Sequence, residues 1–276
     1  MVILITRPGE PGQGLAARLA ALGRRALWWP AFDILPPEDP QAVSDALARL
    51  GQFDLVVFVS PMAVRALADA RAAALAWPEG VAIAAVGGAT RRAAADLAGA
   101  TSAAVIGPEG DAVADGGAEA LWPALAELPQ LPRRVLIVRA QSGRSWLAQR
   151  LQSAGAQVEE LVAYRRLAHE PRASEWAALR AAQEGSDGAL AVLFSSSEAV
   201  AAVTQRLVAA GIAVDGGAAH RALCVHERIA AAARIAGWPR VDACAADAEA
   251  IGRALAEPAP LAPAAAAGPV AGAQQA

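Results

Sequence analysis

The sequence contains two copies of one pattern, separated by 132 residues. The segment Ile3-Leu-Ile-Thr-Arg7 matches Val135-Leu-Ile-Val-Arg139 without a gap, and the similarity continues to Gly23 and Gly155. A solenoid of stacked repeats needs at least about three copies. Two copies instead predict two related α/β lobes that face each other across a cleft, and small-molecule sites form preferentially in such clefts.

Two more segments recur in the same order along the chain. Phe58-Val-Ser-Pro-Met-Ala-Val64 returns as Phe194-Ser-Ser-Ser-Glu-Ala-Val200, and the stretch that begins with Val86-Gly-Gly-Ala-Thr90 returns approximately at 225–237. Three segments of the first half of the chain therefore recur in the same order in the second half. With 276 residues, the chain is long enough for two domains that each bury a core.

Charge and composition exclude several classes of protein. The net charge is −3, so the chain lacks the overall positive field of a nucleic-acid-binding protein. All 24 basic residues are Arg, which removes Schiff-base chemistry and the phosphate-binding lysine of a P-loop. Arg favours bidentate recognition of carboxylates, although a coding preference for Arg is the simpler explanation of its abundance.

The cysteines and histidines show no metal-site pattern. Cys224 and Cys244 lack a metal-type spacing, and His169, His220 and His226 share no spacing either. We therefore expect no metal.

The N-terminus does not resemble a signal peptide, and no apolar run before the tail is long enough to span a membrane. We expect a monomer in the cytoplasm, with no nucleic-acid or membrane partner.

Short apolar runs alternate with helical periodicity, which is the pattern of parallel βαβ units. We predict strands at 2–6, 26–29, 55–59, 81–86, 135–138, 157–162, 189–194 and 222–225. We predict helices at 12–22, 40–50, 61–70, 90–98, 118–125, 145–154, 172–184, 197–210, 228–236 and 248–256. A glycine that suits a left-handed helix C-terminus follows five of them, namely Gly23, Gly99, Gly155, Gly211 and Gly237.

Two extended segments at equivalent positions interrupt this alternation. They are Phe32-Asp-Ile-Leu-Pro-Pro37 and Tyr164-Arg-Arg-Leu-Ala168, and we interpret them as paired connectors between the lobes. Residues 107–117 are rich in Gly and Asp and predict a surface loop. Residues 258–276 contain Ala, Pro and Gly with no charge, so we expect a flexible tail.

Two strand–helix turns carry hydroxyl groups at matching places, Val59-Ser60-Pro61 and Ser195-Ser196-Ser197. A serine at a strand end caps the following helix, and the free backbone N–H groups of that helix attract anions. The alternative that each hydroxyl acts only as a cap remains open.

Tyr164 is the only tyrosine, and we interpret it either as a packed connector aromatic or as a general acid.

A glycine-rich segment, Gly9-Glu-Pro-Gly12-Gln-Gly14, follows the first predicted strand. Its glycines are not in the order of a dinucleotide fingerprint, and no acidic residue ends the second strand. Its repeat partner is Gln141-Ser-Gly-Arg144. Both segments fit an anion-binding loop better than a nucleotide site.

Together these motifs resemble the uroporphyrinogen-III synthase family. The resemblance spans residues 3–257 and is carried by Ile5-Thr6-Arg7-Pro8, Phe58-Val-Ser-Pro61, Val86-Gly-Gly-Ala-Thr90, Arg139, Gly143-Arg144, Tyr164-Arg165 and Phe194-Ser-Ser-Ser197. It implies an α/β fold of two flavodoxin-like parallel-sheet lobes, joined by a two-stranded connector, with a cleft between them. Lobe 1 would be 1–36 and 168–257, and lobe 2 would be 37–167. The first unit of each repeat would then join the later units of the other repeat.

The resemblance also implies an activity. The family cyclises hydroxymethylbilane to uroporphyrinogen III with loss of water, inversion of ring D and no cofactor. Tyr164 matches a tyrosine that assists loss of hydroxide. We expect substrate contacts from Arg7, Ser60, Thr90, Arg139, Ser142, Gly143, Arg144, Ser196, Ser197 and His226. A threonine of the family is absent at 225–229, with His226 or Arg228 as its replacement. A two-lobed binding or sensor protein for an acidic small molecule is the alternative.

Overall fold

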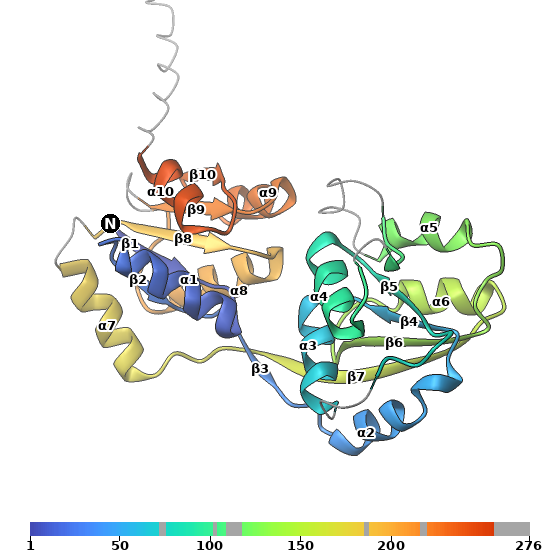
Figure 1. The fold of residues 1–276 in the computed structure, drawn as a ribbon. Coiled ribbons are helices and arrows are strands. Elements are labelled where there is room, and N and C mark those ends of the chain that lie inside the picture. The colour runs from blue at the N-terminus through green and yellow to red at the C-terminus, as the bar shows by residue number, and fades with distance from the viewer. Residues whose placement is uncertain (72–75, 102–103, 109–117, 185–187, 216–219, 257–276) are drawn as a thin grey trace, which may run out of the picture.

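The computed structural model describes residues 1–71, 76–101, 104–108, 118–184, 188–215 and 220–256. It contains two five-stranded sheets with helices on both faces, and the strands are mostly parallel (Figure 1). The mixed α/β class is therefore confirmed. Most of the loop expected at 107–117 and all of the tail expected at 258–276 lie outside the described residues.

The first sheet has the strand order β10-β9-β8-β1-β2, and all its strands run parallel. Its strands are β1 Val2–Ile5, β2 Ala26–Trp28, β8 Leu190–Phe194, β9 Arg221–Cys224 and β10 Arg240–Ala243. The helices that accompany it are α1 Gly9–Ala21, α7 Ala173–Glu184, α8 Ser197–Ala209, α9 Glu227–Ile235 and α10 Ala248–Ala256.

The second sheet has the strand order β3-β7-β6-β4-β5. Its strands are β3 Phe32–Leu35, β4 Leu55–Phe58, β5 Ala82–Ala85, β6 Arg134–Ala140 and β7 Gln157–Ala168. Only β3 is antiparallel, and it pairs with the end of β7 from Phe32 opposite Ala168 to Leu35 opposite Arg165. The helices are α2 Pro40–Ala48, α3 Pro61–Ala70, α4 Gly88–Ala98, α5 Trp122–Ala126 and α6 Trp146–Ser153, with 3₁₀ turns η1 Leu50–Gln52 and η4 Glu119–Leu121.

The strand order exchanges the two sequence repeats between the sheets. β1 and β2 of the first copy join β8 and β9 of the second copy, whereas β6 and β7 of the second copy join β4 and β5 of the first. This is the exchange that the family resemblance implied. The two extended connectors form one antiparallel ladder, β3 with β7, and in Figure 1 this ladder runs between the two sheets.

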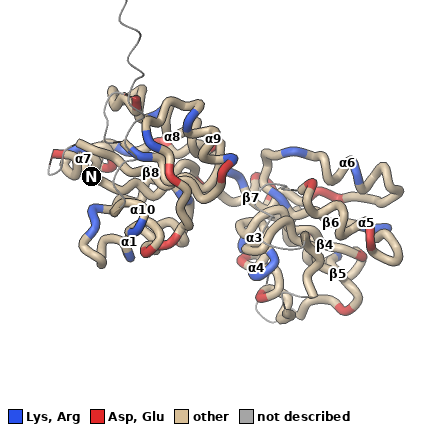
Figure 2. The backbone as a smooth tube through the Cα atoms, turned by 90° about the horizontal axis from the view of Figure 1, so that it is seen from above, with Lys and Arg blue, Asp and Glu red and all other residues tan. Residues whose placement is uncertain are grey.

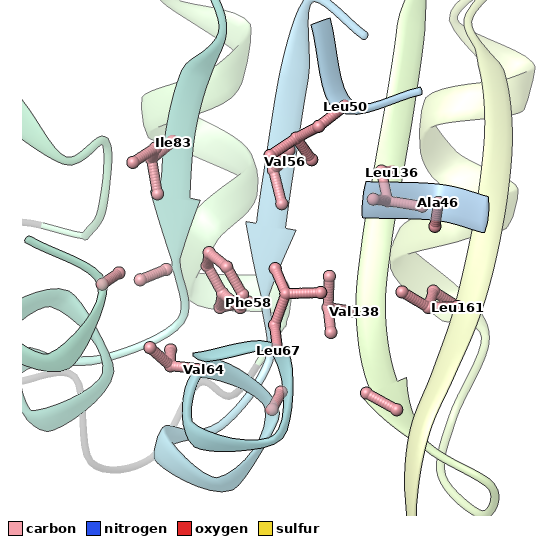
Figure 3. Close-up of a cluster of buried hydrophobic side chains, with 14 of the residues drawn as sticks. Ala46, Leu50, Val56, Phe58, Val64, Leu67, Ile83, Leu136, Val138 and Leu161 are labelled. Atoms are coloured by element: carbon pink, nitrogen blue, oxygen red, sulfur yellow. The ribbon is translucent and has the colours of Figure 1, made fainter. Parts of the chain in front are cut away.

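Each sheet is buried between two layers of helices. In the first sheet, α7, α8 and α9 pack on one face and α1 and α10 on the other. In the second sheet, α2, α3 and α4 cover one face and α5 and α6 the other. Figure 3 shows Phe58 and Val138 beside Val64 and Leu67 of α3. Burying each such large apolar side chain contributes about 1.5–3 kcal/mol.

One prediction about local structure is wrong, and one strand was not predicted. The segment Gly9–Gly14 is not a loop but the first turns of α1. A Cβ on Gly12 would lie 1.9 Å from the Arg7 carbonyl oxygen, so only glycine permits this close packing of helix on chain. The strand β10 was not predicted because its sequence, Arg-Val-Asp-Ala, contains two charges and no apolar run. The five helix-ending glycines do have positive φ, as predicted.

In the view of Figure 2, basic and acidic residues both occur around each of the two sheets. This agrees with the net charge of −3. Among the helices in the described part of the chain, none is both long and apolar enough to cross a membrane.

Candidate active site

A cavity of about 740 Å³ lies where the two sheets meet, beside the ladder of β3 and β7. One wall comes from residues of the first sheet and its helices, and the opposite wall comes from α3 and α4. The ladder contributes Phe32, Ile34, Tyr164 and Arg166. In Figure 1, α1 and α8 face α3 and α4 at this place. The volume lies within the usual range for ligand sites, about 300–1,000 Å³.

Tyr164 and Ser60 meet in the wall of this cavity. The Tyr164 hydroxyl lies 3.0 Å from Ser60 Oγ, within hydrogen-bond distance. Ser60 is the N-cap of α3, and its Oγ accepts a hydrogen bond from the Ala63 N–H at 3.0 Å. Tyr164 is only 7% exposed. The single tyrosine and the first serine turn are thus in direct contact, although they are 104 residues apart in sequence.

A second cavity of about 480 Å³ adjoins the first. Five residues that the sequence marked for substrate contact line it: Ser60, Arg139, Ser142, Gly143 and Arg144. Arg139 forms an ion pair with Glu160 and donates a hydrogen bond to the Gly143 carbonyl at 2.7 Å, which fixes this turn. Ser60, Tyr164 and Arg166 line both cavities, so they stand at the junction of the two spaces.

Arg7 and Ser196, two of the predicted substrate contacts, line the main cavity from the side of the first sheet. Ser196 caps α8 and accepts a hydrogen bond from the Ala199 N–H at 3.1 Å, which repeats the geometry of Ser60. Its neighbour Ser195 also lines the space. The two hydroxyl turns of the repeat therefore approach one cavity from opposite sheets.

Three other predicted contacts lie near the site but do not line these two cavities. Thr90 is buried in the first turns of α4, and Ser197 begins α8. His226 caps α9 by accepting a hydrogen bond from the Arg228 N–H at its Nδ1, at 3.2 Å. An imidazole thus occupies the N-cap position of α9. The roles of these three residues in substrate binding remain predictions.

Sequence reasoning did not select Arg65 or Arg166, which both line the main cavity. Arg166 lies two residues after Tyr164 on one strand, so alternation along β7 places both side chains on the same face. That signal was available in the sequence. Arg65 carries no comparable signal, because its position in the cavity depends on how the two sheets approach each other.

Both cysteines belong to the first sheet, because Cys224 ends β9 and Cys244 directly follows β10. Burial raises the pKa of Cys224 to about 12 and also raises the pKa of Cys244. Only the thiolate reacts with alkylating reagents. Within the described ranges, no three His, Cys, Asp or Glu side chains come together as a metal site would require.

We expect iodoacetamide at neutral pH to modify Cys224 in the native protein on the order of 10³ times more slowly than it modifies free glutathione. The rate should rise as the pH increases, because the thiolate fraction increases. Peptide mass spectrometry measures the rate at each cysteine, and the unfolded protein is the control. Rapid native labelling of Cys224 would show that the β9 end is open to solvent.

Fold and site together define an α/β protein with a small-molecule cavity that is walled by helices of two sheets and carries a tyrosine–serine hydroxyl pair. The family model "Uroporphyrinogen-III synthase HemD" matches residues 13–251. The chain belongs to the uroporphyrinogen-III synthase family.

Individual relatives agree with this assignment. The chain is 31% identical over 180 residues to the uroporphyrinogen-III synthase of Salmonella typhimurium, with 61% of this chain and 66% of the relative aligned. It is 29% identical over 180 residues to that of Escherichia coli, with the same coverage. The alignments therefore span slightly less than two thirds of these relatives.

Solved structures share the fold. A mutant uroporphyrinogen III synthase from Thermus thermophilus superposes with a TM-score of 0.53 at 21% identity, covering 88% of this chain and 92% of the other. The uroporphyrinogen-III synthetase of Helicobacter pylori gives a TM-score of 0.53 at 15% identity, covering 92% and 97%. At these identities, the likeness concerns the fold alone.

Proposed function

We propose that this chain converts hydroxymethylbilane into uroporphyrinogen III, with loss of water and inversion of ring D, and that it needs no metal or organic cofactor. The observation that carries the proposal is the Tyr164–Ser60 hydroxyl pair in the wall of the main cavity, in a chain of this family. A cavity of this kind positions a substrate, and a hydroxyl pair of this kind transfers a proton to it.

In the proposed mechanism, Ser60 is the donor of the hydrogen bond between the two hydroxyls. Ser60 Oγ already accepts from the Ala63 N–H, and its own proton is free to point at the Tyr164 oxygen. Tyr164 then donates its proton toward the cavity. A substrate hydroxyl placed there leaves with help from this proton, while a pyrrole nitrogen supplies the electron pair and an azafulvene results. Tyr164 is thus the proposed general acid.

Ring closure must follow at the substituted carbon of ring D. That carbon attacks the azafulvene to give a spiro intermediate. The bond from the same carbon to the methylene bridge of ring C then breaks, the bridge rejoins at the free α-carbon of ring D, and loss of the proton there yields the inverted macrocycle. Loss of hydroxide and of this proton together account for the released water. The protein controls the outcome by holding ring D, and Arg7, Ser196 and the turn 141–144 are suitably placed to bind its carboxylates.

We further propose that the sheets act as two flavodoxin-like lobes, with lobe 1 at 1–36 and 168–257 and lobe 2 at 37–167. The strand order and the single ladder between the sheets support this division. Because both walls of the cavity come from one chain, a monomer suffices for activity, and we retain the cytoplasm as its location.

If the ladder is a hinge, ligand should draw the lobes together. Small-angle scattering with and without uroporphyrin III should give a smaller radius of gyration in the bound state. The forward scattering also reports the mass, so it tests the monomer. An identical profile in both states would indicate a rigid, preformed cleft.

The alternative of a two-lobed binding or sensor protein shares the cavity and the hinge. It gives no reason for a tyrosine and two serine-capped helices to meet in one site, and family membership disfavours it. A bacterial strain without its own uroporphyrinogen-III synthase separates the two. Expression of this chain should restore type III porphyrins, whereas continued accumulation of type I porphyrins alone would favour the binding protein.

A further inference from the structure

One ion pair crosses the edge of the main cavity. Arg65 Nη1 of α3 lies 3.0 Å from Glu10 Oε2 in the first turn of α1, so the pair joins helices of the two sheets. Arg65 lines the cavity, and its neighbours in the other wall include Pro8 and Pro11, which flank Glu10 in sequence. Without Glu10, the Arg65 guanidinium would face the cavity with no acidic partner at this contact.

Arg65 is one of three arginines that line this cavity. Arg166 stacks on the Phe32 ring at 4.4 Å and pairs with Glu198 at 3.2 Å. The Arg7 guanidinium makes no hydrogen bond or ion pair to any residue that the structure describes. Two of the three guanidinium groups therefore hold a glutamate, and both glutamates come from helices of the first sheet.

A ligand carboxylate can replace Glu10 as the partner of Arg65. The Arg65 side chain is 42% exposed and that of Glu10 is 83% exposed, so water competes for both groups and the pair is weak. A ligand carboxylate that enters the cavity is already held by other contacts. It therefore loses little further freedom when it replaces Glu10 on Arg65, and the closed site screens the new pair less than bulk water does.

We infer that Glu10 occupies the place of a substrate carboxylate on Arg65. In the free protein, the ion pair covers the edge of the cavity. When a polycarboxylate binds, one of its carboxylates takes over the guanidinium and Glu10 swings into solvent. Arg65 is then a substrate-binding residue, and Glu10 is its internal competitor. This inference rests on the proposed function, because it takes an acidic tetrapyrrole as the ligand.

Two variants that break the same ion pair should act in opposite directions. Arg65→Gln removes the ligand contact and should weaken binding of uroporphyrin III, the oxidised eight-carboxylate macrocycle, by about tenfold. Glu10→Gln removes the competitor and should strengthen binding by roughly twofold to fivefold. Quenching of porphyrin fluorescence measures both values, and KM for hydroxymethylbilane should follow them while kcat changes little.

An ion pair that lies wholly within the second sheet and its helices is the control. Arg49 and Glu159 form a two-point ion pair at 2.9 and 3.1 Å with 40% exposure each, and neither lines the main cavity. Arg49→Gln and Glu159→Gln should leave porphyrin binding unchanged. If the Arg65–Glu10 pair only tethered the two sheets, both of its variants would shift binding in the same direction, and the inference would be wrong.

The binding readout keeps this inference separate from the proposed function. Opposite shifts in porphyrin affinity support the exchange at Arg65 even if the chain makes no type III product. Conversely, formation of type III product with unaltered affinity and KM in both variants would overturn the exchange and leave the proposed function intact. Circular dichroism melts of all four variants check that each one folds.

Discussion

Tyr164→Phe should lower the turnover of hydroxymethylbilane by about 10² to 10⁴, the usual contribution of a positioned general acid. The substrate can lose hydroxide unaided, which places the expected value toward the lower end. The phenylalanine ring keeps the packing of the ladder, but the hydrogen bond to Ser60 is lost. We therefore expect the free energy of unfolding to fall by only about 1 kcal/mol.

Ser60→Ala is the companion variant. It removes the same hydrogen bond and the N-cap of α3, at a cost of about 1 kcal/mol in stability, but it leaves the tyrosine hydroxyl in place. Turnover should therefore fall less than in Tyr164→Phe. Full activity of Tyr164→Phe would reduce Tyr164 to a packed aromatic and leave positioning by the arginines and helix N-termini as the source of catalysis.

Arg221→Met should destabilise the protein by about 3 kcal/mol, without a direct effect on the site. Arg221 is only 3% exposed, on β9. Its guanidinium pairs with Asp242 of β10 at 2.9 Å and donates to the carbonyls of Ala254 and Leu255 at the end of α10. The substitution leaves these acceptors without their donor. Arg240 remains as a second partner for Asp242, which limits the loss.

Calorimetry should show a fall in Tm of roughly 6–12 °C for this loss in a protein of this size. Arg253→Met is the control, because Arg253 is an exposed residue of α10 and its loss should change Tm very little. KM should be unaltered in both variants, since neither residue lines the two cavities. Equal melting temperatures for the two variants would show that the β10 edge and α10 contribute little to stability.

The repeat and its periodicity predict most of the fold, because each short apolar run becomes a parallel strand and most of these strands are buried. The ends of elements were less predictable. α1 begins at Gly9 because Gly12 allows the helix to approach the Arg7 carbonyl. This start depends on a packing contact and not on the local helix preference of the sequence. β10 pairs only at the sheet edge, where charged side chains are tolerated.

The site was predictable where local geometry defines it. Ser60 and Ser196 are N-caps because each follows a buried strand and precedes a helix. The contact between Tyr164 and Ser60 was not predicted, because it joins segments 104 residues apart in sequence. Arg65 was not predictable, because its contact with Glu10 arises only when helices of different sheets meet.

The most direct test of the account is the isomer that the purified protein makes. Fresh hydroxymethylbilane is supplied with and without the protein, the products are oxidised, and the two uroporphyrin isomers are separated. The account predicts mainly type III with the protein and type I without it. Type I alone in both samples would contradict the proposal that this chain closes the macrocycle with inversion of ring D.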